Sequence, residues 1–282
     1  MRLAITLGDP AGIGPEVVDA ALDHLPKGVK VTLLGRARNP GEPDLAGAQA
    51  AWDALEEAAH LAIKGKIDAI VTGPVSKHQL HQIGYPFPGQ TEFFAVRSKT
   101  PNYAMCLTGG NLTVALVTAH IPLRHVTLTT PEIIRVSRLL ASHLRRRGIV
   151  KPAIAIAGFN PHAGENGDLG TEEIDIIAPA VAALQKEKHA SFAGPFPPDT
   201  IFHQAAILHK WDGVVCMYHD QGLIPLKLHA FDEGVNVTLG LPFVRTSPDH
   251  GTAFDIAGKG IASPKSMIAA LHLAIALATS QH

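Results

Sequence analysis

Apolar runs of strand length alternate along the whole chain with longer segments whose apolar residues recur at helical spacing. This pattern predicts strands over 2–8, 29–35, 67–74, 103–108, 112–119, 152–159, 213–219 and 235–243. Helices are predicted from Pro15 to about residue 25, over 46–64, from Thr130 to the basic turn at 145–147, and over 171–187, 198–208 and 264–281. Gly109, Gly110 and Asn111 between two apolar runs indicate a hairpin. The alternation therefore predicts an α/β fold with a mostly parallel sheet, helices on both faces and some antiparallel pairing.

The composition favours one well-packed protein without a nucleic-acid partner. Apolar residues make up 46% and charged residues 17% of the 282, and the formal net charge is −1. So few charges argue against disorder, and a near-neutral balance gives no electrostatic footprint for nucleic acid or an acidic membrane. No internal repeat or linker divides the chain, so we expect one unit over 1–282, built of two interleaved α/β lobes that share a sheet.

Two cysteines bear on the compartment. Cys106 and Cys216 lie in separate apolar runs, which is typical of buried, reduced thiols in a cytosolic protein. The first residues read as a strand and turn rather than a signal peptide, and no apolar run has the length of a membrane span. We therefore expect a cytoplasmic protein without a membrane partner.

Three histidines follow three different predicted strands. His120 comes after LTVALVTA, His162 after AIAIAGFNP and His219 after GVVCMY. Because ligands of open α/β sheets bind beyond the carboxyl ends of the strands, converging imidazoles there would form an open site for a divalent ion. A single histidine in such a place more often has a structural role than a metal-binding one. Asp220, beside His219, would orient the imidazole or transfer a proton.

A second group of residues suits an oxyanion. Lys227, Asn236 and Arg245 follow His219 along the chain, and these side chains form charge-assisted hydrogen bonds to phosphate or carboxylate. Incidental surface residues are the alternative reading. The position of Arg245 argues against that reading, because it stands between the apolar run GLPFV and a Ser-Pro turn, an unfavourable place for a charge without a role.

Two glycine-containing loops are candidates for binding a nucleotide. The turn at 8–16 permits close backbone approach to a ligand, yet it lacks the G-x-G-x-x-G fingerprint of dinucleotide sites. The loop at 249–260 precedes the final helix, and Asp255 in it could accept hydrogen bonds from ribose hydroxyls.

Segments in all these regions resemble the 4-hydroxythreonine-4-phosphate dehydrogenases of pyridoxal phosphate biosynthesis. The matching segments, in family order, are GDPAGIGPE (8–16), TGPVSK (72–77), GQTEF (89–93), TAHIPL (118–123), NPHAGENGDLG (160–170), YHDQGLIPLK (218–227) and VNVTLGLPFVRTSPDHGTAFDIAGKG (235–260). The stretch 250–262 also resembles the NAD loop of isopropylmalate and isocitrate dehydrogenases. The resemblance implies that isocitrate/isopropylmalate dehydrogenase-like fold, with two α/β/α subdomains sharing a mostly parallel mixed sheet and a cleft between them. It also implies a homodimer with active sites at the dimer interface.

The resemblance assigns roles to individual positions. Its metal ligands fall on His120, His162 and His219, its substrate contacts on Gln90, Thr91, Lys227, Asn236 and Arg245, and its cofactor contacts on His250, Gly251 and Asp255. Asp220 and Lys227 are the candidate catalytic residues. The chain departs from the family at Gln90, where a histidine is usual and where glutamine can hydrogen-bond but cannot be protonated. It is also shorter than the family between residues 35 and 50, and Ser263 replaces an asparagine of the isopropylmalate enzymes.

The expected activity follows from this resemblance. It is NAD-dependent, or NADP-dependent, oxidative decarboxylation of 4-hydroxy-L-threonine 4-phosphate to 3-amino-2-oxopropyl phosphate and CO2, with one divalent ion (zinc, magnesium or cobalt) per site. A sister dehydrogenase acting on D-threonate or D-erythronate 4-phosphate is the nearest alternative. A phospho-ligand binding protein without catalysis is a third possibility, and an NADH assay separates it from the other two.

Overall fold

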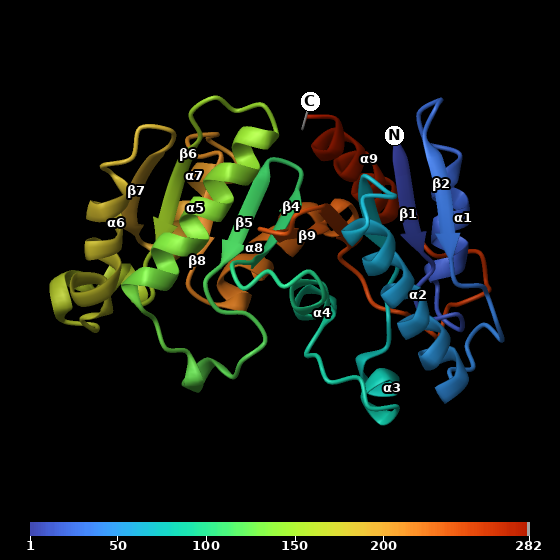
Figure 1. Ribbon diagram of the computed structural model, residues 1–282. Coiled ribbons are helices and arrows are strands. Elements are labelled where there is room, and N and C mark those ends of the chain that lie inside the picture. Colours follow the sequence, from blue (N-terminus) through green and yellow to red (C-terminus); the bar gives the residue numbers. More distant parts are fainter. Residues whose placement is uncertain (281–282) are drawn as a thin grey trace. The chain divides into compact units, whose positions relative to one another are not determined.

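Two parts of the chain, each made of strands with helices packed on them, divide the molecule (Figure 1). A computed structural model describes residues 1–280. We call Met1–Pro101 together with the described part of Asp232–His282 unit 1, and Asn102–Phe231 unit 2. Unit 2 is therefore continuous in sequence, whereas unit 1 is assembled from both ends of the chain.

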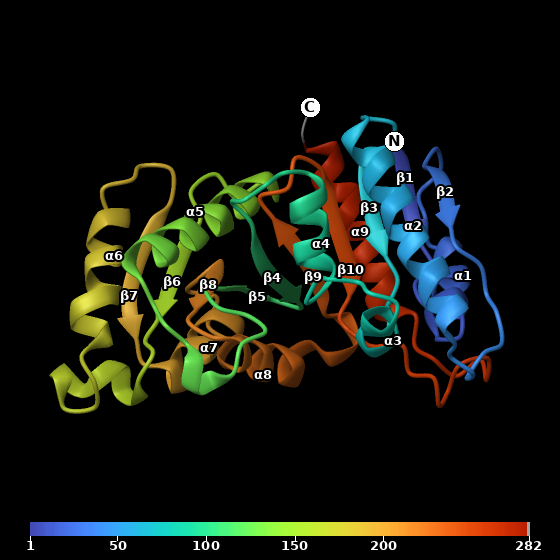
Figure 2. The same cartoon turned by 60° about the horizontal axis from the view of Figure 1, so that its bottom comes forward.

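Unit 1 contains parallel strands with one antiparallel pair. The strands are β1 (Arg2–Thr6), β2 (Lys30–Leu34), β3 (Ala69–Thr72), β9 (Val235–Leu239) and β10 (Val244–Pro248). Their order is β2-β1-β3-β10-β9, and only the β9–β10 pair is antiparallel among them. The helices are α1 (Gly14–Leu22), α2 (Leu45–Ile63), α3 (Lys77–Gln82), α4 (Gln90–Arg97) and α9 (Lys265–Thr279). Helix α2 packs on β1 and β3, while α9 lies beside α1 and packs on β3 and β10 (Figure 2).

Unit 2 has the same kind of architecture. The strands are β4 (Ala104–Gly109), β5 (Leu112–Leu116), β6 (Ala153–Ala157), β7 (Ser191–Phe196) and β8 (Gly213–Cys216), in the order β4-β5-β8-β6-β7. The helices are α5 (Thr130–Arg146), α6 (Ala178–Leu184), α7 (Pro198–Ala206) and α8 (His219–Ala230). Helices α5 and α6 cover one face of these strands, and α7 and α8 cover the other (Figures 1 and 2). Short helical turns lie at Leu123–His125, Pro161–Gly167, Glu173–Ile177 and Phe231–Glu233.

Helix α5 shows why these segments form. The Thr129 side chain accepts a hydrogen bond from the Glu132 backbone N–H at 3.4 Å, which caps the helix, and Pro131 occupies its first turn. The fully buried Ile133 and Leu140 lie on its inward face. Burying each such side chain contributes about 1.5–3 kcal/mol, so the apolar stripe fixes which face of the helix meets the strands.

The structure confirms the α/β class and the hairpin but corrects several boundaries. The strand predicted over 235–243 is confirmed only as far as Leu239, because the backbone turns at Gly240, with φ of 87°, and the chain returns as β10, antiparallel to β9. The strand predicted over 213–219 ends at Cys216, and His219 begins a helix instead. The sequence did not predict helices α3, α4 and α8 or strands β7 and β10, because prolines and glycines within or beside these segments read as chain breakers. The predicted closing helix extends to residue 281, which lies outside the described residues.

Two further sequence expectations can be compared with the structure. Only ten residues, 35–44, connect β2 to α2, in the region expected to be short. Both cysteines are buried and free, and burial raises the pKa of the Cys106 thiol to about 12. Among residues 1–280, no helix combines the length and apolar character that crossing a bilayer would require.

Candidate functional site

The three candidate histidines follow neighbouring parallel strands of unit 2. Strand β8 pairs in parallel with β5 on one side and with β6 on the other. Their carboxyl ends therefore lie at one edge, and His120, His219 and His162 come after β5, β8 and β6 respectively. The strand order thus agrees with the topological argument made from the sequence.

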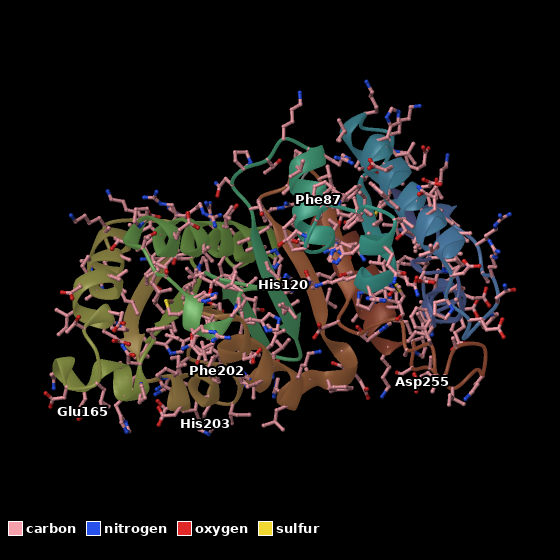
Figure 3. All side chains as sticks on the ribbon, turned by 90° about the horizontal axis from the view of Figure 1, so that it is seen from below. Phe87, His120, Glu165, Phe202, His203 and Asp255 are labelled. Carbon is pink, nitrogen blue, oxygen red and sulfur yellow. The ribbon has the colours of Figure 1, made fainter. Side chains whose placement is uncertain are left out.

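His120 and His219 lie together at a cavity. Their ring centroids are 5.7 Å apart, with the ring planes inclined by 43°. The cavity has a volume of about 190 Å³ and is lined by His120, Ile121, Leu123, Val126, Tyr218, His219 and Asp220. Figure 3 labels His120 on the loop that follows β5. Two imidazoles beside an apolar wall are suited to binding an ion or a polar substrate group.

Asp220 fixes the orientation of the His219 ring. Its Oδ1 lies 2.7 Å from Nδ1 of His219, so the carboxylate can accept the Nδ1 proton and leave Nε2 as the nitrogen with a lone pair. Asp220 is largely exposed, with 71% of its side chain accessible. This geometry favours an orienting role for Asp220, while its predicted role in proton transfer remains a prediction.

His162 is presented by an unusual turn. Residues 162–166 all have positive φ, between 44° and 80°, so the backbone winds in the left-handed sense. For residues other than glycine this conformation costs about 1–2 kcal/mol each, and such strain is typical of functional segments held by their surroundings. The exposed His162 therefore owes its position to contacts made elsewhere.

Glu173 supplies those contacts. Its Oε1 accepts hydrogen bonds from the backbone N–H groups of Phe159 and Asn160, both at 2.7 Å, and its Oε2 accepts from Asn160 Nδ2 at 2.9 Å. Burial would raise the pKa of Glu173, but the donors on Asn160 and Phe159 outweigh it and hold that pKa below its ordinary value. The charged carboxylate of Glu173, with both oxygens hydrogen-bonded, thus holds the backbone at Phe159 and Asn160, just before the left-handed turn.

His162 is not among the residues that line the cavity of His120 and His219. Within residues 1–280 no group of three His, Cys, Asp or Glu side chains is placed to hold a metal. Figure 3 shows Glu165, on the same turn as His162, well away from His120. Of the three predicted ligands, His120 and His219 line the cavity, with the carboxylate of Asp220 beside them.

Arg245 is the centre of a second cluster, in unit 1. It lies on β10 with 2% of its surface exposed. Its Nη2 donates to Thr72 Oγ1 at 2.6 Å and to Gln90 Oε1 at 2.9 Å, and its Nη1 donates to Thr238 Oγ1 at 3.3 Å. The guanidinium carbon lies 5.7 Å from the centroid of the Phe94 ring.

These contacts leave the charge of Arg245 without a carboxylate partner, since its hydrogen-bond acceptors are neutral oxygens. Burial lowers its pKa to about 10, a value at which the guanidinium is still protonated near neutral pH. The nearby charge of Glu92 raises this pKa only in part. A buried cation that forms no hydrogen bond to a carboxylate is suited to recognising an anion.

The other predicted substrate contacts divide between the units. Thr91 is buried on α4, with its hydroxyl 3.3 Å from that of Thr238, so the structure brings Thr91, Gln90 and Arg245 together. Asn236 lies opposite Ser247 in the β9–β10 pair, and its Oδ1 is buried without a hydrogen-bond partner in the described part of the chain. Lys227 belongs to α8 of unit 2, with its Nζ 5.6 Å from the Phe231 ring centroid.

The two candidate nucleotide loops pack against each other in unit 1. The Ile13 backbone N–H donates to the Thr252 carbonyl at 2.9 Å, and that of Gly258 donates to Glu16 Oε2 at 3.0 Å. A Cβ on Gly12 would lie 2.9 Å from the Thr252 carbonyl oxygen, so this close approach requires glycine. The contact connects the loop after β1 to the loop at 249–260.

The predicted cofactor residues lie on this second loop. Gly251 and Asp255 are exposed, and Figure 3 shows Asp255 at the outer edge of unit 1. His250 is half-buried, with its Nδ1 3.1 Å from the Gly251 carbonyl oxygen. Accessible side chains on a rigidly held loop fit the predicted contact with a nucleotide.

Sequence reasoning missed three residues that shape these clusters. Thr72 and Thr238 accept hydrogen bonds from Arg245, and Glu173 anchors the turn that carries His162. Thr72 left a detectable signal, because it is a polar residue at the end of the apolar strand AIVT. Glu173 left none, since it lies in a helical segment rich in acidic residues.

Comparison with known proteins identifies the family. The curated 4-hydroxythreonine-4-phosphate dehydrogenases of Desulforapulum autotrophicum and Synechococcus sp. are both 42% identical to the chain, over 98% and 99% of it and 95% of each relative. A crystal structure of the Klebsiella pneumoniae 4-hydroxythreonine-4-phosphate dehydrogenase superimposes with a TM-score of 0.83 at 40% identity, covering 98% of this chain and 99% of that one. Isocitrate dehydrogenase from Methylococcus capsulatus, at 15% identity and a TM-score of 0.56, covering 98% of this chain and 87% of its own, shares the fold alone. The sequence profile of the family described as "Pyridoxal phosphate biosynthetic protein PdxA" matches residues 14–274, and the chain belongs to that family.

Proposed function

We propose that the protein catalyses the NAD-dependent oxidative decarboxylation of 4-hydroxy-L-threonine 4-phosphate to 3-amino-2-oxopropyl phosphate and CO2, in pyridoxal phosphate biosynthesis. The observation that carries this proposal is the 42% identity, over 98% of the chain, to a relative named for this activity. The site chemistry is consistent with it, because the substrate carries phosphate and carboxylate groups and the buried Arg245 guanidinium donates its hydrogen bonds to neutral oxygens.

Each polar cluster has a defined task in this reaction. Arg245 and Lys227 bind the substrate's anionic groups through charge-assisted hydrogen bonds, and Thr91 and Asn236 orient its neutral donors. His120 and His219 face the reacting hydroxyl at the cavity, where Asp220 keeps His219 in one tautomer. Ile121, Leu123 and Val126 form the apolar wall of this cavity.

A divalent ion fits two of the predicted ligands in one chain. Imidazole nitrogens suit zinc or cobalt, and His120 and His219 would hold such an ion, with His162 completing the set in the assembled protein. The ion would lower the pKa of the substrate hydroxyl and stabilise negative charge that develops on oxygen. His162 does not line the cavity that His120 and His219 line, so we infer that a second copy of the chain supplies the third ligand to each site.

The surface of α8 supports this homodimer. Ile224, Leu228 and Phe231 are 66%, 88% and 74% exposed and recur at helical spacing, which forms an apolar stripe on the outside of unit 2. Exposed apolar stripes of this kind mark protein interfaces. We therefore propose a homodimer, and the free, buried cysteines support its location in the reducing cytoplasm.

For the cofactor we propose NAD, bound on the loop at 249–260, which the loop after β1 holds in place. The hydrogen bonds that join these loops support a single nucleotide site, and Asp255 is available to accept from ribose hydroxyls. A carboxylate at that place would repel a 2′-phosphate, which favours NAD over NADP.

A substrate panel tests the function. The purified protein is incubated with NAD and, separately, 4-hydroxy-L-threonine 4-phosphate, D-threonate 4-phosphate and D-erythronate 4-phosphate, and the NADH absorbance band is followed with and without a chelator. We expect NADH formation with the amino acid substrate and its loss on chelation. Preference for a sugar acid phosphate would refute the proposed substrate, and binding without NADH formation on any substrate would refute catalysis.

A further inference from the structure

The hydrogen bonds of Arg245 leave little of its guanidinium ready for a substrate. A guanidinium carries five N–H donors. Both hydrogens of Nη2 are used, one by Thr72 and one by Gln90, and Nη1 gives one to Thr238. Nε is buried and has no hydrogen-bond partner within residues 1–280.

This pattern blocks the strongest way of binding an oxyanion. Carboxylate and phosphate bind a guanidinium bidentately along one of two edges, Nη1–Nη2 or Nε–Nη2. Each of these edges includes an Nη2 hydrogen, and neutral oxygens occupy both hydrogens here. A bidentate anion can therefore bind only if Thr72 or Gln90 leaves.

Gln90 is the acceptor that can leave. Thr72 is fully buried within strand β3, so its hydroxyl has no room to withdraw. Gln90 is half-buried at the first position of α4, on a side chain with three rotatable bonds. Apart from Arg245 it is held by one neutral hydrogen bond, from its Nε2 to the Gly73 carbonyl oxygen at 3.1 Å.

The exchange is favourable because the two acceptors differ in charge. A hydrogen bond from a cation to an anionic oxygen is about twice as strong as one between neutral groups, and it gains further in a buried place. The amide oxygen of Gln90 is strong enough to satisfy the buried cation in the free protein and too weak to compete with phosphate.

We propose that Gln90 is a displaceable cap on Arg245: substrate binding replaces the Gln90 amide oxygen on Nη2 by an oxygen of the substrate's phosphate or carboxylate. The inference rests on the proposed function for the identity of the anion. It makes Gln90 a specificity-determining residue, because only a bidentate oxyanion regains what displacing the amide costs. It also changes the role expected from the sequence, in which Gln90 hydrogen-bonds the substrate.

Inorganic phosphate is the probe, because its binding can be measured without turnover. The dissociation constant of phosphate is measured by calorimetry for the wild type, Gln90→Ala, Gln90→Glu and the control Gln82→Ala, whose glutamine is exposed and pairs with His78. Removing the cap removes a competitor, so we expect Gln90→Ala to bind phosphate about three- to tenfold more tightly. Gln90→Glu places a permanent anion on Arg245, so we expect at least about a hundredfold weaker binding and a higher melting temperature without phosphate.

Unchanged or weaker phosphate binding in Gln90→Ala would overturn the proposal. Weaker binding is the result expected of a residue that positions Arg245 or contacts the anion directly. A second measurement needs no variant: the side-chain amide resonances of Gln90 should shift when the wild-type protein is saturated with phosphate, and unmoved resonances would also overturn it. Failure of the proposed function is distinguishable, because phosphate could displace Gln90 as expected while no substrate of the panel yields NADH.

Discussion

Replacing Glu173 by alanine removes the acceptor on which the backbone before His162 depends. The carboxylate accepts from the Phe159 and Asn160 backbone N–H groups and from the Asn160 side chain, at 2.7, 2.7 and 2.9 Å. The residue is 3% exposed, so water cannot easily replace it. Each buried donor left without a partner costs about 1–3 kcal/mol, which gives a loss of roughly 3–5 kcal/mol in the free energy of unfolding after partial relaxation.

The same change should impair function more than stability alone explains. Residues 162–166 hold a left-handed conformation that costs about 1–2 kcal/mol for each residue other than glycine, and without the anchor this strain is relieved by a return to ordinary backbone angles. His162 would then leave its position. We expect kcat/KM to fall at least about a hundredfold at a temperature where the variant is folded, while the dissociation constant for NAD stays unchanged.

Urea denaturation and steady-state kinetics check these two expectations. Glu173→Gln keeps one acceptor oxygen for the backbone donors, so its loss should be roughly 1–2 kcal/mol with partial activity. Asp175→Asn, at an exposed position of the same helical turn, serves as the control and should match the wild type. A folded Glu173→Ala protein with wild-type kcat/KM would show that the turn does not depend on Glu173.

Three further predictions concern other parts of the molecule. Burial, aided by Arg147, lowers the pKa of His143 from 6.5 to about 3, so below pH 6.5 the unfolded state binds a proton that the folded state excludes. The free energy of unfolding should therefore fall by about 1.4 kcal/mol per pH unit between pH 6.5 and 3. In urea denaturation at several pH values, His143→Leu should lack this contribution. Gly12→Ala places a Cβ 2.9 Å from the Thr252 carbonyl oxygen and so disturbs the packing of the two loops. The KM for NAD should rise about tenfold or more, while the dissociation constant of phosphate stays unchanged. An unaltered KM would show that NAD binding does not depend on the contact between the loops. Because burial lowers the pKa of Arg245 to about 10, phosphate affinity should hold to about pH 9 and fall as the pH rises through 10, and calorimetry showing no such loss would count against a charged Arg245 as the anion site.

Local pattern was sufficient for the architecture of unit 2. Buried strands such as β5 and β8 read as continuous apolar runs, and helix α5 shows a cap, an amphipathic stripe and a basic end. Because parallel strands end at one edge, this reading also predicted that functional side chains would follow β5, β6 and β8. The proximity of His120 and His219 could therefore be predicted from the sequence.

Other features depended on contacts that no local pattern encodes. Gln90 and Arg245 are 155 positions apart, and their hydrogen bond exists because α4 begins beside the strand that carries Arg245. The reversal at Gly240 ends β9 and returns the chain as β10, which pairs in parallel with β3 and brings the Arg245 guanidinium to Thr72. Neither feature follows from residue type alone, because a glycine in an apolar run is as compatible with a bulge as with a turn.

The sequence by itself thus determined the fold class, the strand ends that carry chemistry and the family, since hydrophobic periodicity and short motifs act over a few residues at a time. Only the tertiary structure decided which acceptors satisfy the buried Arg245, how Glu173 supports the turn bearing His162, and that two of the three candidate histidines lie together at the cavity. The physical reason is that hydrogen bonds and burial depend on distances between segments remote in the chain, and packing sets those distances.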